Sequence, residues 1–231
     1  MPQSDDPQRE SLSSVLGAIA RTLQSEPDVD RTLAAIVKAA VDHVDGAEQA
    51  GISLVENGRI RTVAPTGEAV VTVDEIQYHT GQGPCLDAIA EHHVYCTGNL
   101  LGERRWPAFA PEAAETGIRS MLSYRLFITH TTLGALNLYS TQVGAFNDQT
   151  EQDGQVFAAH AAIALVGAQT EAQLHAAIET RDVIGMAKGI LMQRHDLDDV
   201  QAFHMLVETS QNTNIKLHQV ATWLVEHRRD L

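Results

Sequence analysis

The spacing of apolar residues divides the chain into a mixed front part and a helical tail. Apolar positions at helical intervals predict helices over residues 11–24 and 28–44. The period then changes, and short apolar runs flank the dipeptide Asn57-Gly58. Asn-Gly between such runs favours a two-residue hairpin turn. The front part is therefore expected to combine helices with an antiparallel hairpin.

The same reading extends over the rest of the front part. It predicts two helical pieces over 68–91 broken at Gly81-Gln82-Gly83-Pro84, a strand at 93–97, a helix at 106–116, and strands at 120–129 and 133–140. The resulting order, α-α-β-β-α-β-α-β-β, is typical of an α+β domain with a mostly antiparallel sheet and flanking helices.

The tail is predicted to be all helical. One helix runs from Asp148 to about Arg194 without a clear cap, and such a length suggests a connector or a coiled coil. Asp198 and Gln201 then resemble a capping box at the start of a second helix, and a third follows at about 215–227. We expect three parts: an α+β domain at 1–150, a connecting helix at 151–175, and a three-helix domain at 176–231.

Apolar stripes of the tail predict its core. Ala187 and Leu191 share one stripe of the first tail helix, and Leu206 belongs to the second. Phe203 and Trp223 carry rings that could stack on bases. Their apolar neighbours favour a place in the core instead.

Composition limits the classes that the chain can belong to. Apolar residues make up 44% and charged residues 20%, which suits a packed core and argues against long disorder. No stretch approaches the ~18 consecutive apolar residues of a membrane helix. The polar, acidic start has no apolar segment typical of a secretory signal. The two cysteines, Cys85 and Cys96, lack C-x-x-C spacing, so we expect reduced thiols in a cytoplasmic protein.

The net charge of −14 argues against a general grip on polyanions. Most of it lies in the front of the chain: residues 1–175 carry 10 Lys and Arg against 22 Asp and Glu, whereas residues 176–231 carry 6 against 8. A nucleic-acid site in the tail would therefore be a local patch with specific, shape-led binding.

Two motif sets resemble known families. The run from Met186 to Met192, MAKGILM, resembles the signature of the ANTAR family, bacterial RNA-binding domains that act in transcription antitermination. The segments GQGPCLDAI (81–89), RWPAF (105–109), GIRSML (117–122) and LGALNLYS (133–140) resemble a GAF domain, especially those ahead of ANTAR domains in actinobacterial regulators. The order implies a GAF sensor that controls ANTAR binding to RNA hairpin loops, in a homodimer, rather than an enzyme.

The ANTAR resemblance implies an RNA-binding surface. The candidate residues are Lys188, Gly189, Arg194, Ser210, Asn214 and Lys216. Basic side chains and helix N-termini attract phosphate, and small residues let a backbone approach closely. The alternative is an ordinary solvated helix face.

The GAF resemblance implies a small-molecule site between the sheet and the helices that cover it. The candidate lining is Tyr78, Cys85, Tyr95, Trp106 and Phe109. The ligand and any cofactor are left open. Cys85 could be a redox sensor, a chromophore attachment point or a metal ligand, but a buried structural thiol is the favoured interpretation. The pair His92-His93 has poor metal-ligand spacing, so no metal site is predicted, although a haem ligand stays an alternative.

Other function classes find less support. The chain lacks a nucleophile elbow, an HExxH run, a P-loop and a kinase signature, so no enzyme is predicted. A DNA-binding regulator would want a basic recognition helix, and the third tail helix offers only Lys216 near its start. A ligand-binding or dimerisation module without RNA activity is the remaining alternative.

Overall fold

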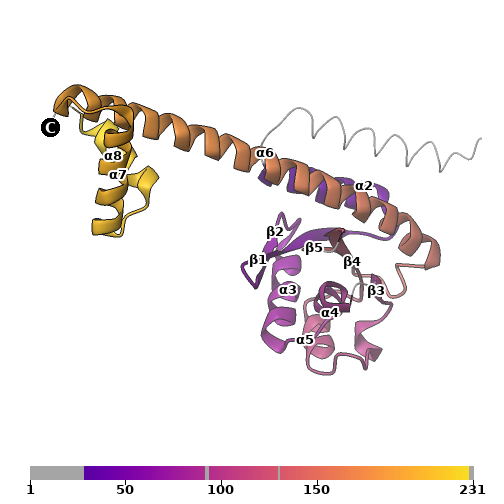
Figure 1. Ribbon diagram of the computed structural model, residues 1–231. Helices are drawn as coiled ribbons and strands as arrows, with labels where there is room; N and C mark the ends of the chain where they lie inside the picture. The colour runs from indigo at the N-terminus through magenta and orange to yellow at the C-terminus, as the bar shows by residue number, and fades with distance from the viewer. Residues whose placement is uncertain (1–28, 92–93, 130, 229–231) are drawn as a thin grey trace, which may run out of the picture. The chain divides into compact units, whose positions relative to one another are not determined.

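The computed structural model describes residues 29–91, 94–129 and 131–228 (Figure 1). The helix predicted over 11–24 and the pair His92-His93 lie outside these ranges. The chain divides into two compact units, Met1–Gln169 and Thr170–Leu231. Each is described by itself, and helix α6 (Asp148–His195) contributes residues to both.

The first unit is built on an antiparallel sheet of five strands in the order β2-β1-β5-β4-β3. The strands are β1 (Gln49–Glu56), β2 (Arg59–Val63), β3 (Val94–Thr97), β4 (Ser120–Ile128) and β5 (Thr131–Ser140). Asn57 and Gly58 both have positive φ, at 51° and 76°, as the mirror-image turn of a two-residue hairpin requires. The predicted antiparallel sheet is confirmed.

Helices cover both faces of this sheet (Figure 1). Helix α2 (Val29–His43) and the start of α6 pack on one face. Helices α3 (Glu68–Thr80), α4 (Pro84–Glu91) and α5 (Phe109–Glu115) lie on the other, with the short 3-10 helix η1 (Leu100–Gly102). The helix predicted at 106–116 is shorter, so Trp106 precedes it.

The face under α2 and α6 is an ordinary hydrophobic core. Strand residues Ile52, Leu122 and Leu138 pack against Ile36 of α2 and Phe157 of α6, and all five are buried. Burying an aliphatic or aromatic side chain of this size contributes ~1.5–3 kcal/mol. This face therefore accounts for the alternating apolar positions of the strands and fixes which residues must point to the opposite face.

One glycine permits the closest approach within the sheet. Gly134 of β5 has φ +155°, and a Cβ atom there would clash with the carbonyl oxygen of Ser53 on β1. Only glycine combines this backbone conformation with such a neighbour. The pairing of β1 with β5 depends on it.

The second unit packs three helices around a small core. The end of α6 meets α7 (Asp199–Thr213) and α8 (Leu217–Glu226). The buried core residues are Ala187, Leu191, Ala202, Leu206, Ala221 and Leu224. Asp198 accepts a hydrogen bond from the Gln201 backbone while the Gln201 side chain returns one to Asp198, so the predicted capping box is confirmed.

The expectation that two aromatic residues of the tail are buried is wrong. Phe203 is 40% exposed and Trp223 is 52% exposed. The core stripe of α8 runs through Ala221 and Leu224. Trp223 lies one residue before Leu224 and so is turned ~100° from that stripe. Phe203 stands one position after Ala202 in the same way.

No helix within the described ranges is long and apolar enough to cross a membrane.

Candidate functional site

The second face of the sheet carries polar side chains that are completely buried. The strand register aligns Asn137 of β5 with Ser123 of β4, and Ser123 with Tyr95 of β3. Ser53 of β1 stands beside this row, and Ser53, Ser123 and Asn137 have no exposed surface. Burying polar groups is costly unless they are hydrogen-bonded. This face is therefore the best candidate for a binding site in the first unit.

A buried carboxylate on α3 organises this polar face. Asp74 accepts hydrogen bonds from Thr62 Oγ1 at 2.7 Å, from Gln77 Nε2 at 3.0 Å and from the Tyr139 hydroxyl. Asn137 Nδ2 lies 3.5 Å away. Burial raises the pKa of Asp74 to about 6, although the hydrogen bonds from Tyr139 and Thr62 act in the opposite direction. In the described part of the chain these donors are all neutral.

Two of the predicted ligand residues join this network. The Tyr78 hydroxyl shares hydrogen bonds with Ser53 Oγ at 2.7 Å and Thr62 Oγ1 at 2.9 Å. Cys85, at the start of α4, is fully buried, and its backbone N–H donates to Gln77 Oε1 at 2.9 Å. The expected burial of the Cys85 thiol is thus confirmed.

Two polar atoms of the face have unused hydrogen-bonding capacity. Asn137 Oδ1 and Ser123 Oγ are buried and find no partner among the described residues. Since the two residues are direct partners across β4 and β5, an acceptor and a hydroxyl stand side by side. Such a pair suits a small molecule that carries both a donor and an acceptor.

The other three predicted ligand residues form an aromatic cluster. The rings of Tyr95 and Trp106 lie 6.2 Å apart and those of Trp106 and Phe109 6.4 Å apart, both edge to face. Trp106 Nε1 donates to Asp87 Oδ2 at 2.7 Å, and the Arg105 guanidinium lies 4.3 Å above the Trp106 ring. Trp106 and Phe109 are buried, so these contacts already satisfy them.

The thiols are not activated. Burial raises the pKa of Cys85 and that of Cys96 to about 12 each, whereas a reactive cysteine needs a lowered pKa and exposure. No group of three or more His, Cys, Asp or Glu side chains in the described ranges could hold a metal ion. The chemistry of the first unit is therefore that of hydrogen bonding.

Several key residues of this site were not anticipated from sequence. Asp74, Ser53 and Asn137 were missed, although the strand segments ISLV and LNLYS place a polar residue among apolar ones. That alternation was the available signal for the two strand residues. Nothing local singles out Asp74 on its helix.

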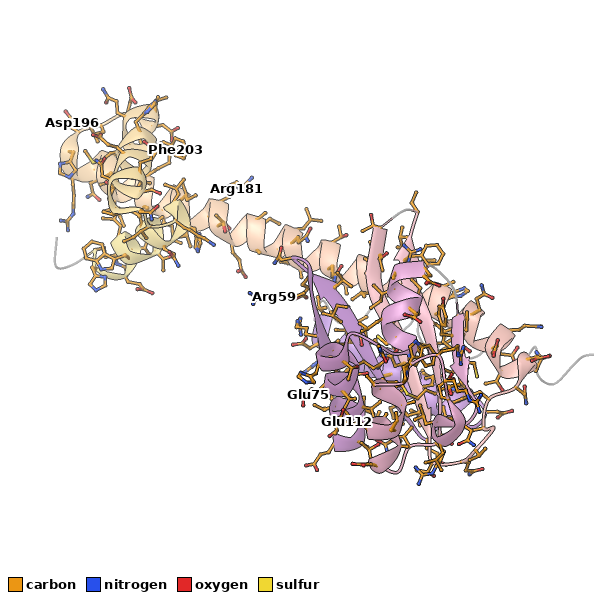
Figure 2. The ribbon with its side chains drawn as sticks, turned by 90° about the horizontal axis from the view of Figure 1, so that it is seen from below. Arg59, Glu75, Glu112, Arg181, Asp196 and Phe203 are labelled. Carbon is orange, nitrogen blue, oxygen red and sulfur yellow. The ribbon has the colours of Figure 1, made fainter. Side chains whose placement is uncertain are left out.

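The candidate RNA residues of α6 lie on the surface of the second unit. Lys188 forms an ion pair with Asp199, and its ammonium lies 6.0 Å from the Phe203 ring (Figure 2 labels Phe203). The Arg194 guanidinium donates to the carbonyl of Arg228 at 2.6 Å. Gly189 is exposed with open space around it.

The remaining candidates meet at the turn between α7 and α8. Ser210 Oγ donates to the Ile215 carbonyl at 2.6 Å, and Asn214 ends α7 in the left-handed conformation. Lys216 is exposed and stands just before α8. Ser210 and Asn214 thus have a structural role in the turn, and Lys216 is the cation that the turn presents.

The geometry defines an α+β domain with one buried polar sheet face, joined to an all-α three-helix domain. A GAF domain family model matches residues 26–166 and an ANTAR domain model matches residues 172–225. The chain therefore belongs to the GAF family and carries an ANTAR domain behind it, the order of a GAF–ANTAR regulator.

Solved structures show the same fold at low sequence identity. A free methionine-R-sulfoxide reductase from Neisseria meningitidis has a TM-score of 0.56 and 16% identity, covering 74% of this chain and 96% of that chain. The GAF domain of a phosphoenolpyruvate-protein phosphotransferase from Coxiella burnetii has a TM-score of 0.53 and 13% identity, covering 70% and 96%. Among curated proteins no match was found.

Proposed function

We propose that this chain is an RNA-binding transcription antitermination regulator, in which the GAF domain senses a small molecule and controls ANTAR binding to RNA hairpin loops. The observation that carries the proposal is the ANTAR match over the second unit, behind a GAF domain. The surface of that unit supports it, because Lys188 and Lys216 lie near exposed aromatic rings. RNA loops are bound by cations together with such rings.

The signal is proposed to be a small polar molecule bound at the buried polar face. Asn137 Oδ1 and Ser123 Oγ offer unpaired hydrogen-bonding capacity, and Asp74 stands beside them. Sites for small ligands typically combine apolar walls with a few placed polar groups. The Tyr95, Trp106 and Phe109 rings would supply the walls.

The regulator is proposed to act as a cytoplasmic homodimer through α6. Leu174 and Ile178 lie one turn apart on this helix, and both are exposed. In the first unit Ile163 of α6 is also exposed, and it lines a groove of ≈ 740 Å³ with Phe127. Exposed apolar side chains at such spacing are typical of helices that pair.

No enzymatic activity is proposed. Methionine sulfoxide reductases share the GAF fold, but fold alone does not carry function. The raised pKa of both thiols is the opposite of what thiol chemistry needs.

The RNA proposal is tested by selection followed by binding. Hairpin RNAs with one fixed stem and randomised loops are enriched on the purified chain. Affinity is then measured for the best hairpin, a loop-scrambled version and duplex DNA. We expect clear preference for the selected loop.

Substitution separates a specific site from general charge. Lys188→Ala is expected to weaken binding about tenfold, roughly the value of one hydrogen bond to a charged group. Lys38→Ala, which removes an exposed lysine of the first unit, should leave affinity unchanged. Failure to enrich any loop, or equal affinity for all three nucleic acids, would sink the RNA proposal.

A further inference from the structure

Trp223 is exposed on α8 although it is one of the largest apolar side chains of the chain. Half of its surface is accessible, at 52%. Its indole stacks on the His227 ring, with centroids 4.6 Å apart and planes inclined by 18°. The pair stays parallel one helical turn apart, with the outer indole surface in solvent. A soluble domain rarely exposes such a ring without a use for it.

The stacked pair borders a groove between α7 and α8. The groove has a volume of ≈ 580 Å³, within the range of small-ligand sites. It is lined by Thr209, Thr213, Ile215, Gln219, Val220 and Trp223. Ile215 is exposed as well, so the groove has an apolar floor with an amide at its rim.

A cation stands on the same side of α8. Lys216 precedes the helix, and the spacing of residues 216, 220, 223 and 227 returns to one face at each turn. The face therefore presents an ammonium group, the groove residue Val220 and the stacked rings in sequence. Exposed Glu226 lies near the far end and disfavours a phosphate there.

We propose that the Trp223–His227 pair is a stacking platform for one unpaired base of the RNA loop, with the adjoining phosphate at Lys216. The inference rests on the proposed RNA-binding function and extends its surface beyond Lys188. An aromatic face of this kind accepts any base, while the Gln219 amide adds donors and acceptors for a base edge. A protein partner would instead want a broader apolar patch without a cation beside the ring.

The test uses the full chain and the hairpin RNA that selection provides. The chain holds two tryptophans, and Trp106 is buried, so quenching on binding reports on Trp223. 2-Aminopurine is placed at each loop position in turn. We expect one position to lose fluorescence on binding, together with quenching of tryptophan emission that Trp223→Phe abolishes.

Affinity gives the second readout. Trp223→Ala is expected to weaken hairpin binding about tenfold, which lies within the range for stacking of one base. Trp223→Phe keeps an aromatic face and should stay within about threefold of the parent. Met205→Ala, another exposed apolar residue of this unit, should bind normally.

Three results would overturn the inference. The first is parent-like affinity of Trp223→Ala with no quenching, while Lys188→Ala is impaired; the RNA-binding function then stands without this platform. The second is a change in oligomeric mass of Trp223→Ala at unchanged affinity per protomer, which would make the face a protein interface. The third is a parent chain that binds no hairpin, which removes the proposed function itself.

Discussion

At the scale of single residues, the charge state of Asp74 dominates the first unit. The carboxylate is buried against the sheet and is held by Thr62, Gln77 and Tyr139. Because its pKa is raised to about 6 by burial, the folded state binds a proton more readily than the unfolded chain does. Its contribution to stability is full below about pH 4 and is lost as pH rises through about 6.

Asp74→Asn should remove this pH dependence. The difference in unfolding free energy, variant minus parent, is expected to increase from pH 4 to pH 7 by at most on the order of 3 kcal/mol, given ~1.4 kcal/mol per pKa unit. Urea unfolding followed by Trp106 emission in a Trp223→Phe background measures it. Glu75→Gln, on an exposed neighbour in the same helix (Figure 2), is the control. Parallel pH curves for Asp74→Asn and parent would contradict the assignment.

Both thiols should resist labelling in the native protein. Burial holds the pKa of Cys85 and Cys96 near 12, so little thiolate forms at pH 8. With an aromatic disulfide reagent we expect no labelling within minutes, and two thiols per chain in denaturant. Cys96→Ser isolates Cys85, which should be the slower of the two because it is fully buried. Rapid native labelling of that variant would show an accessible Cys85.

At the scale of elements, the pairing of β1 with β5 depends on one backbone position. Gly134 has φ +155° and lies directly against the Ser53 carbonyl. The same strand carries Asn137 to the polar face, where it aligns with Ser123. Disturbing the approach of the two strands would therefore disturb the candidate ligand site as well.

Gly134→Ala is expected to destabilise the first unit by about 3 kcal/mol or more, since strain and a backbone clash add. Gly58→Ala is the matched comparison, because Gly58 also has positive φ but open space around it. It should cost only ~1–2 kcal/mol, the value of the conformation alone. Thermal unfolding of both variants checks the order, and equal losses would show that the clash is relieved by movement.

The sequence predicted nearly every described element, for local reasons. Asn57-Gly58 sets a turn, and Asp198 with Gln201 caps a helix, through contacts within a few residues. Exposure was less accessible: apolar spacing marked Phe203 and Trp223 as core, yet the small bundle is filled by alanine and leucine. The polar face depends on residues as far apart as Asp74 and Asn137, which no local pattern joins. The domain boundaries at 150 and 175 stay predictions.

At the scale of the whole molecule, charge limits how RNA can be held. The chain carries a net charge of −14, and residues 176–231 hold six basic against eight acidic residues. Lys188 is already paired with Asp199. Binding by this tail should therefore use few phosphate contacts and rely on shape and stacking.

The salt dependence of hairpin binding should accordingly be shallow. Each phosphate contact on single-stranded nucleic acid contributes a slope of about −0.7 in log K against log salt. With no more than about four contacts, we expect a slope shallower than about −3 between 50 and 200 mM KCl. Lys216→Ala should reduce the slope by one such contact. A much steeper parent slope would indicate a general electrostatic grip.

The strand order also has a consequence for solubility. β2 is an outer strand, and its exposed edge is a template on which another chain could add a strand. Arg59 and Arg61 stand on this strand, and Arg61 is held by Glu56 at 2.9 Å through two nitrogen atoms. Charged side chains on an edge discourage such addition. These arginines therefore matter less for how the chain folds than for keeping folded copies from joining edge to edge into aggregates.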